Sequence, residues 1–189
     1  MTTQRGGASG FVSLGSEVLW RGRRVGMRRG SFRAPDGEQF ESEYMDHPGA
    51  VAVIAVDDDR RVTLVRQFRG PMGRTVLEIP AGTRDVSGEA AEETGRRELA
   101  EEVGLRAERW EQLAPLPVSP GVSDQITTVF LATGLSECPR GREGPEERAM
   151  TIERVPIDDV VAMVGAGELM DAVTVAGVAL AREVLERRG

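Results

Sequence analysis

A stretch of 24 residues in the middle of the chain, from Gly82 to Leu105, constrains the fold more than any other part of the sequence. Glu98, Glu101 and Glu102 follow one another at i, i+3 and i+4, so their side chains share one face if the segment is helical. Like charges at this spacing repel one another and weaken a helix. Their presence indicates that a cation lies between them, and carboxylate oxygens are the ligands that Mg²⁺ prefers.

The residues around these acids predict a helix from about residue 89 to residue 103. Ser87 or Gly88 is expected as the N-cap, which places Glu89 in the first turn, near the positive end of the helix dipole. Gly104 is expected to end the helix in the left-handed conformation. The segment is therefore predicted to be one helix, with a glycine before it and a glycine after it.

The spacing of the acids resembles the Nudix box, the sequence pattern of hydrolases that act on nucleoside diphosphates linked to another group. That pattern reads Gly, five residues, Glu, seven residues, Arg-Glu, an aliphatic residue, any residue, Glu-Glu, any residue, Gly and an aliphatic residue. From Glu89 to Leu105 the match is complete, whereas six residues rather than five separate Gly82 from Glu89. The extra residue falls in the loop before the helix, where an insertion costs little.

The resemblance implies a role for each charged residue of the box. Glu98 and Glu102, one turn apart, are the first choices as ligands of Mg²⁺ or Mn²⁺, with Glu101 beside them as a further ligand and catalytic group. The main-chain carbonyl of Ala81 is implied as an additional ligand, and Arg97 is implied to pair with a box acid and orient it. The alternative, a solvated charged face, is typical of an isolated Glu-Glu pair and explains the whole pattern poorly.

Several segments outside the box resemble the ADP-ribose pyrophosphatase branch of the Nudix hydrolases, and the resemblance covers residues 16–185. The segments are Val65-Arg66-Gln67-Phe68-Arg69, Leu77-Glu78-Ile79-Pro80-Ala81-Gly82, Ser119-Pro120-Gly121-Val122-Ser123-Asp124 and the pair Glu146-Glu147. The substrate-binding residues that this resemblance implies are Arg66, Arg69, Glu78 and Gly121. Arg69 would hold a phosphate in a charge-assisted fork; the alternative is a surface arginine at a strand edge.

A general base is expected outside the box, because the box acids are expected to be occupied by cations. Residues 137–148 are polar and predict a mobile loop, and the resemblance places the catalytic acid of this loop at Glu147, with Glu146 as the next choice. Glu143 lies on the same loop, so the position of the base stays open among the loop acids.

The composition of the 189-residue chain excludes several other kinds of protein. All 24 basic residues are arginines, which excludes a lysine nucleophile, and a net charge of −7 argues against general nucleic-acid binding. The single histidine, His47, excludes a multi-histidine zinc site. The single cysteine, Cys138, excludes an internal disulfide and fits a reducing, cytoplasmic location. No apolar run approaches the ~18 residues of a membrane span, so no membrane partner is expected.

Hydrophobic patterns predict strands that alternate with helices. The expected strands are residues 16–29, 38–46, 50–56, 61–68, 76–79, 110–116, 127–132 and 150–156. Two later helices are expected, a short one that Asp158 or Asp159 caps and that ends at Val164, and a last one over residues 170–187. A turn is expected at Pro35-Asp36-Gly37 and another at Asp57-Asp58-Asp59. Across the second turn, residues 61–68 are expected to pair with residues 50–56.

This order of elements indicates an α/β protein. By resemblance it is a Nudix-type α/β/α sandwich with a mixed sheet, preceded by an N-terminal β region. We expect a disordered tail at residues 1–14, the N-terminal β region at 15–46 and the Nudix hydrolase domain at 47–189.

Three functions are consistent with the sequence. The first is Mg²⁺-dependent hydrolysis of the pyrophosphate of ADP-ribose to AMP and ribose 5-phosphate. The second is hydrolysis of another nucleoside diphosphate sugar or of a dinucleotide. The third is a non-catalytic nucleotide-binding regulator, against which the intact acids argue. The resemblance also implies a small-molecule nucleotide substrate and a homodimer, in which the N-terminal β region helps to build the partner's active site.

Overall fold

The computed structural model describes residues 10–141 and 148–188. Contacts divide the chain into two compact units. The first unit consists of Met1–Pro48 and Pro117–Gln125, and the second consists of Gly49–Leu116 and Ile126–Gly189. The first unit therefore contains a segment from the second half of the chain, which a division of the sequence into consecutive domains does not anticipate.

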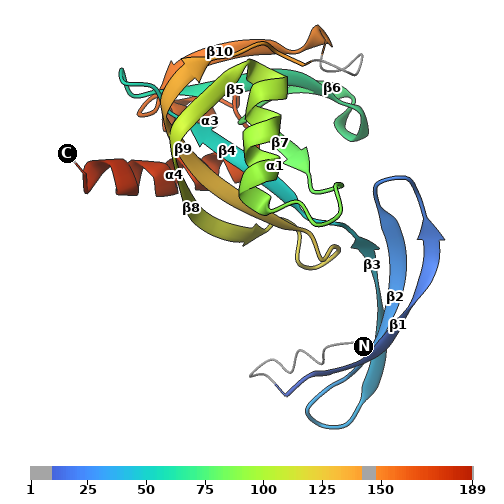
Figure 1. Ribbon diagram of the computed structural model, residues 1–189. Coiled ribbons are helices and arrows are strands. Elements are labelled where there is room, and N and C mark those ends of the chain that lie inside the picture. Colours follow the sequence, from blue (N-terminus) through green and yellow to red (C-terminus); the bar gives the residue numbers. More distant parts are fainter. Residues whose placement is uncertain (1–9, 142–147, 189) are drawn as a thin grey trace. The chain divides into compact units, whose positions relative to one another are not determined.

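The first unit is built on three strands, β1 (Val12–Arg21), β2 (Gly26–Arg33) and β3 (Gln39–Asp46). They form an antiparallel sheet in the order β1-β2-β3 (Figure 1). The prediction of one strand over residues 16–29 is wrong, because the chain reverses between β1 and β2. The N–H of Gly22 donates to the carbonyl of Val25 at 2.8 Å and closes that turn. β1 also begins at Val12, before the expected start of the β region at residue 15.

The loop at residues 119–124 belongs to the first unit because it lies along the end of β3. The N–H of Met45 donates to the carbonyl of Val122 at 2.9 Å. The N–H of His47 donates to the carboxylate of Asp124, also at 2.9 Å. These contacts tie the loop to residues that lie far from it in the sequence.

The second unit contains two sheets. Its strands are β4 (Ala50–Ala55), β5 (Arg61–Arg69), β6 (Arg74–Glu78), β7 (Ala81–Thr83), β8 (Leu105–Pro117), β9 (Ile126–Glu137) and β10 (Thr151–Pro156). A mixed sheet has the order β7-β4-β9-β8, in which β9 is parallel to β4 and β7 is antiparallel to it. An antiparallel sheet has the order β10-β5-β6.

The expected pairing of residues 61–68 with residues 50–56 is wrong. β7 and β9 occupy the two edges of β4, so no edge is left for β5. One isolated bridge, between Val56 and Val62, follows the strand, and β5 then joins β6 and β10 in the other sheet.

The two turns predicted from the sequence are confirmed. Gly37 has φ = +93°, which suits the turn at Pro35-Asp36-Gly37. In the turn after β4, the carboxylate of Asp57 accepts the N–H of Asp59 at 3.1 Å and the N–H of Arg61 at 2.8 Å. The side chain of Asp57 therefore stabilises this turn.

Helices cover both faces of the mixed sheet (Figure 1). α1 (Ala91–Glu98) and the π-helical turn η2 (Leu99–Val103) lie on one side, and α4 (Ala172–Glu186) lies on the other. The described residues also form α3 (Val160–Gly165) and the 3₁₀ turn η1 (Gly70–Met72). None of the helices in residues 10–141 and 148–188 is long and apolar enough to cross a membrane.

Adjacent residues of β4 explain this layering. Val53 and Ile54 are both fully buried, and neighbouring residues of a strand point to opposite faces. A Cβ atom on Gly95 of α1 would lie 3.5 Å from Val53, and a Cβ atom on Gly177 of α4 would lie 2.9 Å from Ile54. Each helix thus packs closely on its own face of the strand, and the expected α/β/α sandwich is confirmed.

The box helix ends as predicted but begins with a different cap. Gly104 follows η2 with φ = +69°, which confirms the left-handed C-terminal glycine. Ala90, rather than Ser87 or Gly88, precedes the helix, and its N–H donates to the carboxylate of Glu93 at 3.1 Å. Alanine has no side-chain acceptor, so Glu93 supplies the side-chain half of the cap.

Candidate active site

Two box acids, Glu98 and Glu102, project from the helical segment onto β7. Glu102 is 7% exposed, and its carboxylate accepts the N–H of Ala81 at 3.0 Å. The carboxylate of Glu98 lies over Gly82: a Cβ atom at position 82 would come within 2.0 Å of the Glu98 Cδ. Glycine is therefore required at position 82 because the carboxylate of Glu98 fills the space that a side chain would need.

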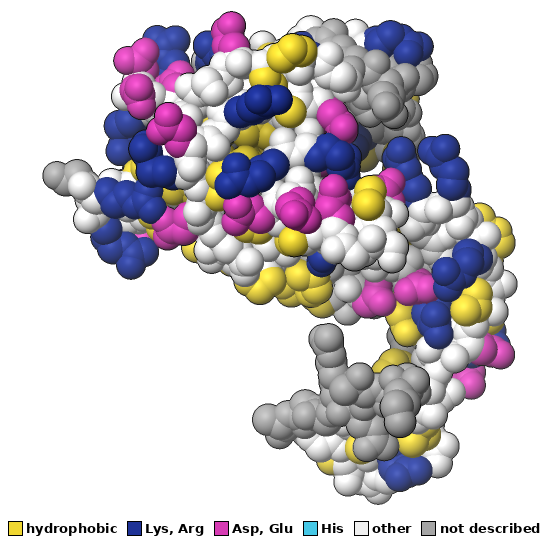
Figure 2. Space-filling view, viewed as in Figure 1, with side chains coloured by type: hydrophobic (Ala, Val, Ile, Leu, Met, Phe, Trp, Pro, Cys, Tyr) yellow, Lys and Arg dark blue, Asp and Glu magenta, His cyan; other side chains and the backbone are white. Residues whose placement is uncertain are grey.

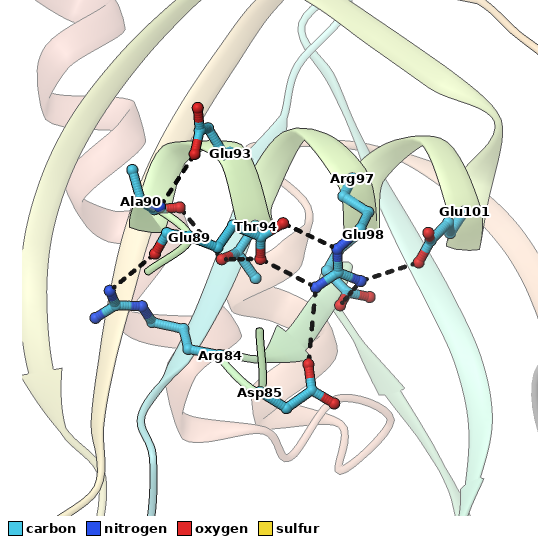
Figure 3. Close-up of polar contacts among 9 residues, drawn as sticks. All are labelled: Arg84, Asp85, Glu89, Ala90, Glu93, Thr94, Arg97, Glu98 and Glu101. Atoms are coloured by element: carbon cyan, nitrogen blue, oxygen red, sulfur yellow. Dashed lines mark hydrogen bonds and ion pairs between the residues drawn. The ribbon is translucent and has the colours of Figure 1, made fainter. Parts of the chain in front are cut away.

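Arg97 lies among the carboxylates of the box (Figure 3). Its Nη1 donates to Glu98 at 2.8 Å and to Glu101 at 3.1 Å. Its Nε and Nη2 each donate to Glu89 at 3.3 Å, and its Nη2 is 4.0 Å from the carboxylate of Asp85. Acidic side chains and arginines are interspersed over the face of the second unit that carries α1 (Figure 2).

The surroundings shift the pKa values of two of these acids in opposite directions. Burial raises the pKa of Glu98; Arg97 opposes this effect, and the charges of Glu101 and Asp85 add to it. The pKa of Glu89 is lowered, mainly by its hydrogen bond from Arg97 and also by one from Thr94. Burial thus outweighs the contact with Arg97 at Glu98, whereas the contact with Arg97 favours the charged form of Glu89.

The donor set suits a hard divalent cation, but the side chains are engaged with one another. Glu98, Glu101 and Glu102 offer carboxylate oxygens, the ligands that Mg²⁺ and Mn²⁺ take in proteins. Within the described residues, however, no group of three or more His, Cys, Asp or Glu side chains is arranged to hold a metal ion. Arg97 binds one oxygen of Glu98 and one of Glu101, and the N–H of Ala81 binds one of Glu102, so a cation that took the oxygens held by Arg97 would have to displace it.

A second arginine–carboxylate pair links the ends of β5 and β6. Arg69 forks onto Glu78, with Nε at 3.1 and 2.9 Å from the two carboxylate oxygens and Nη2 also in contact. Glu78 is 8% exposed and also accepts a hydrogen bond from Gln67 at 3.4 Å. Burial alone lowers the pKa of Arg69, but Glu78 outweighs this effect and raises it, with Glu102 and Asp171 contributing.

Four further residues were expected at the site, and the structure describes two of them. Arg66 pairs with Glu153 of β10 at 2.5 Å, and because it is three positions from Arg69 on one strand, the two arginines point to opposite faces. Gly121 is exposed and lies in a turn of the first unit. Glu146 and Glu147 lie outside the described residues.

The family model of the NUDIX domain matches residues 46–174, which is more than half of the chain. The chain belongs to the Nudix family. The match contains the whole box and the Arg69–Glu78 pair. It thus covers the second unit as far as the first turn of α4.

Two ADP-ribose pyrophosphatases and a methanol dehydrogenase activator match the chain along most of its length. It is 41% identical over 168 residues to an ADP-ribose pyrophosphatase of Mycobacterium tuberculosis, covering 89% of this chain and 81% of the relative. It is 36% identical over 162 residues to an ADP-ribose pyrophosphatase of Bacillus subtilis, covering 86% of this chain and 87% of the relative. It is 31% identical over 166 residues to a methanol dehydrogenase activator of Bacillus methanolicus, covering 88% of this chain and 89% of the relative. A crystal structure described as an ADP compounds hydrolase superposes on this chain with a TM-score of 0.78 at 25% identity. The superposition covers 94% of this chain and 95% of the other.

Thr174 supports the Nudix site from α4 and was not anticipated from the sequence. Its hydroxyl accepts the N–H of Ile79 at 3.0 Å and donates to the carboxylate of Asp171 at 2.6 Å. Thr174 is fully buried, and Ile79 lies between Glu78 and the β7 residues that contact the box acids. An Asp three residues before a Thr at a helix start is a capping pattern, so the cap was readable from the sequence, but its link to Ile79 was not.

Arg140 supports the other end of the box helix and was also not anticipated. Its guanidinium donates to the main-chain carbonyl of Glu102. A Cβ atom on Gly104 would lie 2.5 Å from the Arg140 Cγ, so glycine at this position also leaves room for the arginine. The residue lies 38 positions from Glu102 in sequence, and no local pattern indicates the contact.

Proposed function

We propose that this protein hydrolyses the pyrophosphate of ADP-ribose to AMP and ribose 5-phosphate in a reaction that depends on Mg²⁺ or Mn²⁺. The observation that carries the proposal is the 41% identity, over 89% of this chain, to a relative named as an ADP-ribose pyrophosphatase. A second relative of the same name, at 36% identity over 86% of the chain, adds support. The complete set of box acids provides the chemistry that such a reaction needs.

The proposed metal ligands are Glu98, Glu101, Glu102 and the main-chain carbonyl of Ala81. The burial of Glu102 and the partial burial of Glu98 support this set, since removing a carboxylate from water favours a nearby cation. When bound, a divalent cation neutralises charge on the pyrophosphate and lowers the pKa of a bound water. Arg97 then keeps Glu89 ionised and in place beside the site.

Arg69 is the proposed phosphate-binding residue, and Glu78 is the residue that holds it. The fork onto Glu78 uses Nε and Nη2 of Arg69. Within residues 10–141 and 148–188, Nη1 of Arg69 donates no hydrogen bond, so it is available for a phosphate oxygen. Arg66 and Gly121 remain proposed substrate contacts, although the ion pair of Arg66 with Glu153 gives that arginine a structural partner.

Glu147 is the proposed general base, with Glu146 as the neighbouring candidate. Glu147→Gln is expected to lower kcat by roughly 10²–10⁴-fold, the range typical of a lost general base, with KM within a few fold of the wild-type value. The pH profile of kcat should lose its acidic limb in this variant. Glu143→Gln is the matched control and should have little effect. If Glu146→Gln gives the phenotype instead, the base is one residue earlier; if no loop acid matters, the base lies in the box.

A homodimer built through the N-terminal β region is the proposed assembly. One face of the β1-β2-β3 sheet carries a cluster of aromatic rings, with Phe40 stacked on Phe32 at 5.5 Å and in edge contact with Phe11 at 6.2 Å. Phe11 and Phe40 are 45% and 41% exposed, and a small sheet needs its apolar face covered to be stable. Sedimentation of an active, monodisperse monomer at micromolar concentration would contradict this assembly.

A second candidate function is hydrolysis of a different ADP-linked or nucleoside diphosphate sugar substrate. The description of the similar crystal structure as an ADP compounds hydrolase favours keeping this wider class. A panel of nucleoside diphosphate sugars and dinucleotides, assayed with Mg²⁺ and with products separated by chromatography, distinguishes the two. A tenfold preference in kcat/KM for a substrate other than ADP-ribose would overturn the first proposal.

We propose a cytoplasmic location, which the single cysteine supports.

A further inference from the structure

Arg97 has two kinds of carboxylate partner, and they meet different atoms of its guanidinium. Nη1 serves Glu98 and Glu101, at 2.8 and 3.1 Å. Nε and Nη2 serve Glu89, at 3.3 Å each, and Nη2 also faces Asp85. Glu98 and Glu101 are proposed metal ligands, whereas Glu89 and Asp85 are not.

The proposed cation and Arg97 therefore compete for oxygens of the same two acids. Nη1 of Arg97 contacts one oxygen of each carboxylate, Oε1 of Glu98 and Oε2 of Glu101. A divalent ion that takes them leaves Nη1 without these partners, and an arginine that is 30% exposed among acids then needs another one. Glu89 is already engaged, because it also accepts the hydroxyl of Thr94 at 2.7 Å.

Asp85 is placed to take up the displaced guanidinium. Its carboxylate lies 4.0 Å from Nη2, and an approach of about 1 Å would form a charge-assisted hydrogen bond. Within the described ranges, the Asp85 carboxylate accepts no hydrogen bond, and it is 53% exposed, so it can move. The backbone beneath it is anchored, with the N–H of Arg84 donating to Gly49 at 3.1 Å and the N–H of Asp85 donating to Thr83 at 3.0 Å.

We propose that Asp85 is a positioning residue that holds Arg97 when a divalent cation occupies Glu98 and Glu101. The loop between Gly82 and Glu89, which is one residue longer than the Nudix pattern, carries this acid. When the cation binds, Arg97 gives up its Nη1 contacts with Glu98 and Glu101 and gains a contact with Asp85. Because the guanidinium is then paired, its positive charge repels the cation less. This inference rests on the proposed metal site.

Direct binding of Mn²⁺ to the full-length protein, followed by electron paramagnetic resonance at about 0.15 M salt, tests the exchange. Asp85→Asn should weaken Mn²⁺ binding about threefold to fivefold, the size expected for a half-exposed ion pair. Asp85→Glu should restore binding. Glu92→Gln is the matched control, since Glu92 pairs with Arg96 on the same helix at similar exposure, 47%, and should bind Mn²⁺ as the wild type does.

The deciding measurement is the effect of Asp85→Asn in an Arg97→Gln background. If Asp85 acts through Arg97, removal of the arginine abolishes the effect of Asp85→Asn. An equal weakening in both backgrounds would mean that Asp85 acts by its own charge or as a ligand, and would overturn the inference while leaving the proposed metal site intact. If Arg97→Gln does not fold, Arg97→Met keeps the apolar stem and serves as the background. A wild-type protein that fails to bind Mn²⁺ would overturn the metal site, and the inference with it.

Discussion

Arg97 of the box helix and Arg69 of β5 are both held by carboxylates, but in different ways. Arg97 divides its donors among several acids, and Nη1 alone serves two of them. Arg69 directs its fork to a single acid, Glu78, which is 8% exposed and has Gln67 as a further partner. Around Arg97 the negative charge exceeds the positive charge, whereas the Arg69–Glu78 pair is balanced.

This difference indicates different roles. A cluster with excess negative charge and shared hydrogen bonds can admit a cation and rearrange. A bidentate pair with one buried partner fixes the direction of the arginine, which is what the recognition of a phosphate needs.

Replacing the two least exposed box acids, Glu98 and Glu102, should have the largest effect. Glu98→Gln and Glu102→Gln are each expected to lower kcat by about a hundredfold or more, because loss of a proposed metal ligand would remove charge stabilisation of the transition state. Circular dichroism should show an intact fold. Glu92→Gln, on the same helix, should retain wild-type turnover, and near-normal rates for both ligand variants at saturating Mg²⁺ would remove the metal site from this cluster.

Gly82→Ala tests whether the position of Glu98, and not only its charge, matters. The added methyl group would lie 2.0 Å from the Glu98 Cδ, so the carboxylate must move. A displacement of about 1 Å at a catalytic group reduces turnover on the order of a hundredfold or less. Gly165→Ala is the control, since a methyl group added there would meet no atom of the described chain within 4 Å. Unchanged turnover of Gly82→Ala would mean that the packing of Glu98 on β7 is not needed.

Glu78→Gln tests the fixed pair. The free energy of unfolding, measured with urea, should fall by about 1–2 kcal/mol, a value reduced from that of a fully buried pair because Arg69 is 41% exposed. The KM for ADP-ribose should rise, because Arg69 loses its orientation. Glu153→Gln breaks the more exposed pair with Arg66 and should cost less than about 1 kcal/mol. An equal cost for the two variants would contradict a special role for Glu78.

The smallest expected effect is a pH dependence of stability without divalent cations. Burial raises the folded-state pKa of Glu98, so the folded chain binds more protons than the unfolded chain. The contribution of Glu98 is present below the unfolded pKa of ~4.3 and is lost as the pH rises through the raised folded pKa. Urea unfolding across this range should therefore show the stability of the wild type falling with pH relative to Glu98→Gln.

Glu89 provides the internal control for that measurement, because its folded pKa is lowered. Its contribution is present above the unfolded pKa and is lost as the pH falls through the folded pKa. Glu89→Gln should therefore change the pH dependence in the opposite sense. If both variants changed the slope of stability against pH in the same sense, the explanation would be wrong. Burial would then not be the cause of the Glu98 pKa shift, or the contact with Arg97 would not be the cause of the Glu89 pKa shift.

The local features of the protein could be predicted from its sequence. The i, i+3, i+4 acids, the glycine after them and the turn residues at 35–37 and 57–59 predicted the box helix, its end and two turns, because these depend on neighbouring residues. The alternation of strands and helices predicted the α/β class. Matching these patterns to the Nudix box was enough to expect the family.

Contacts between residues far apart in the sequence depend on how the whole chain packs. The strand at 61–69 does not pair with β4, because β7 and β9 occupy both edges of β4. Which strands occupy an edge depends on the whole sheet. The need for glycine at position 82 arises from Glu98, and the support of Ile79 comes from Thr174, 95 positions later. The partners of Arg69 and Arg97 follow the same rule, because a guanidinium binds whichever carboxylates the packed chain places within its reach.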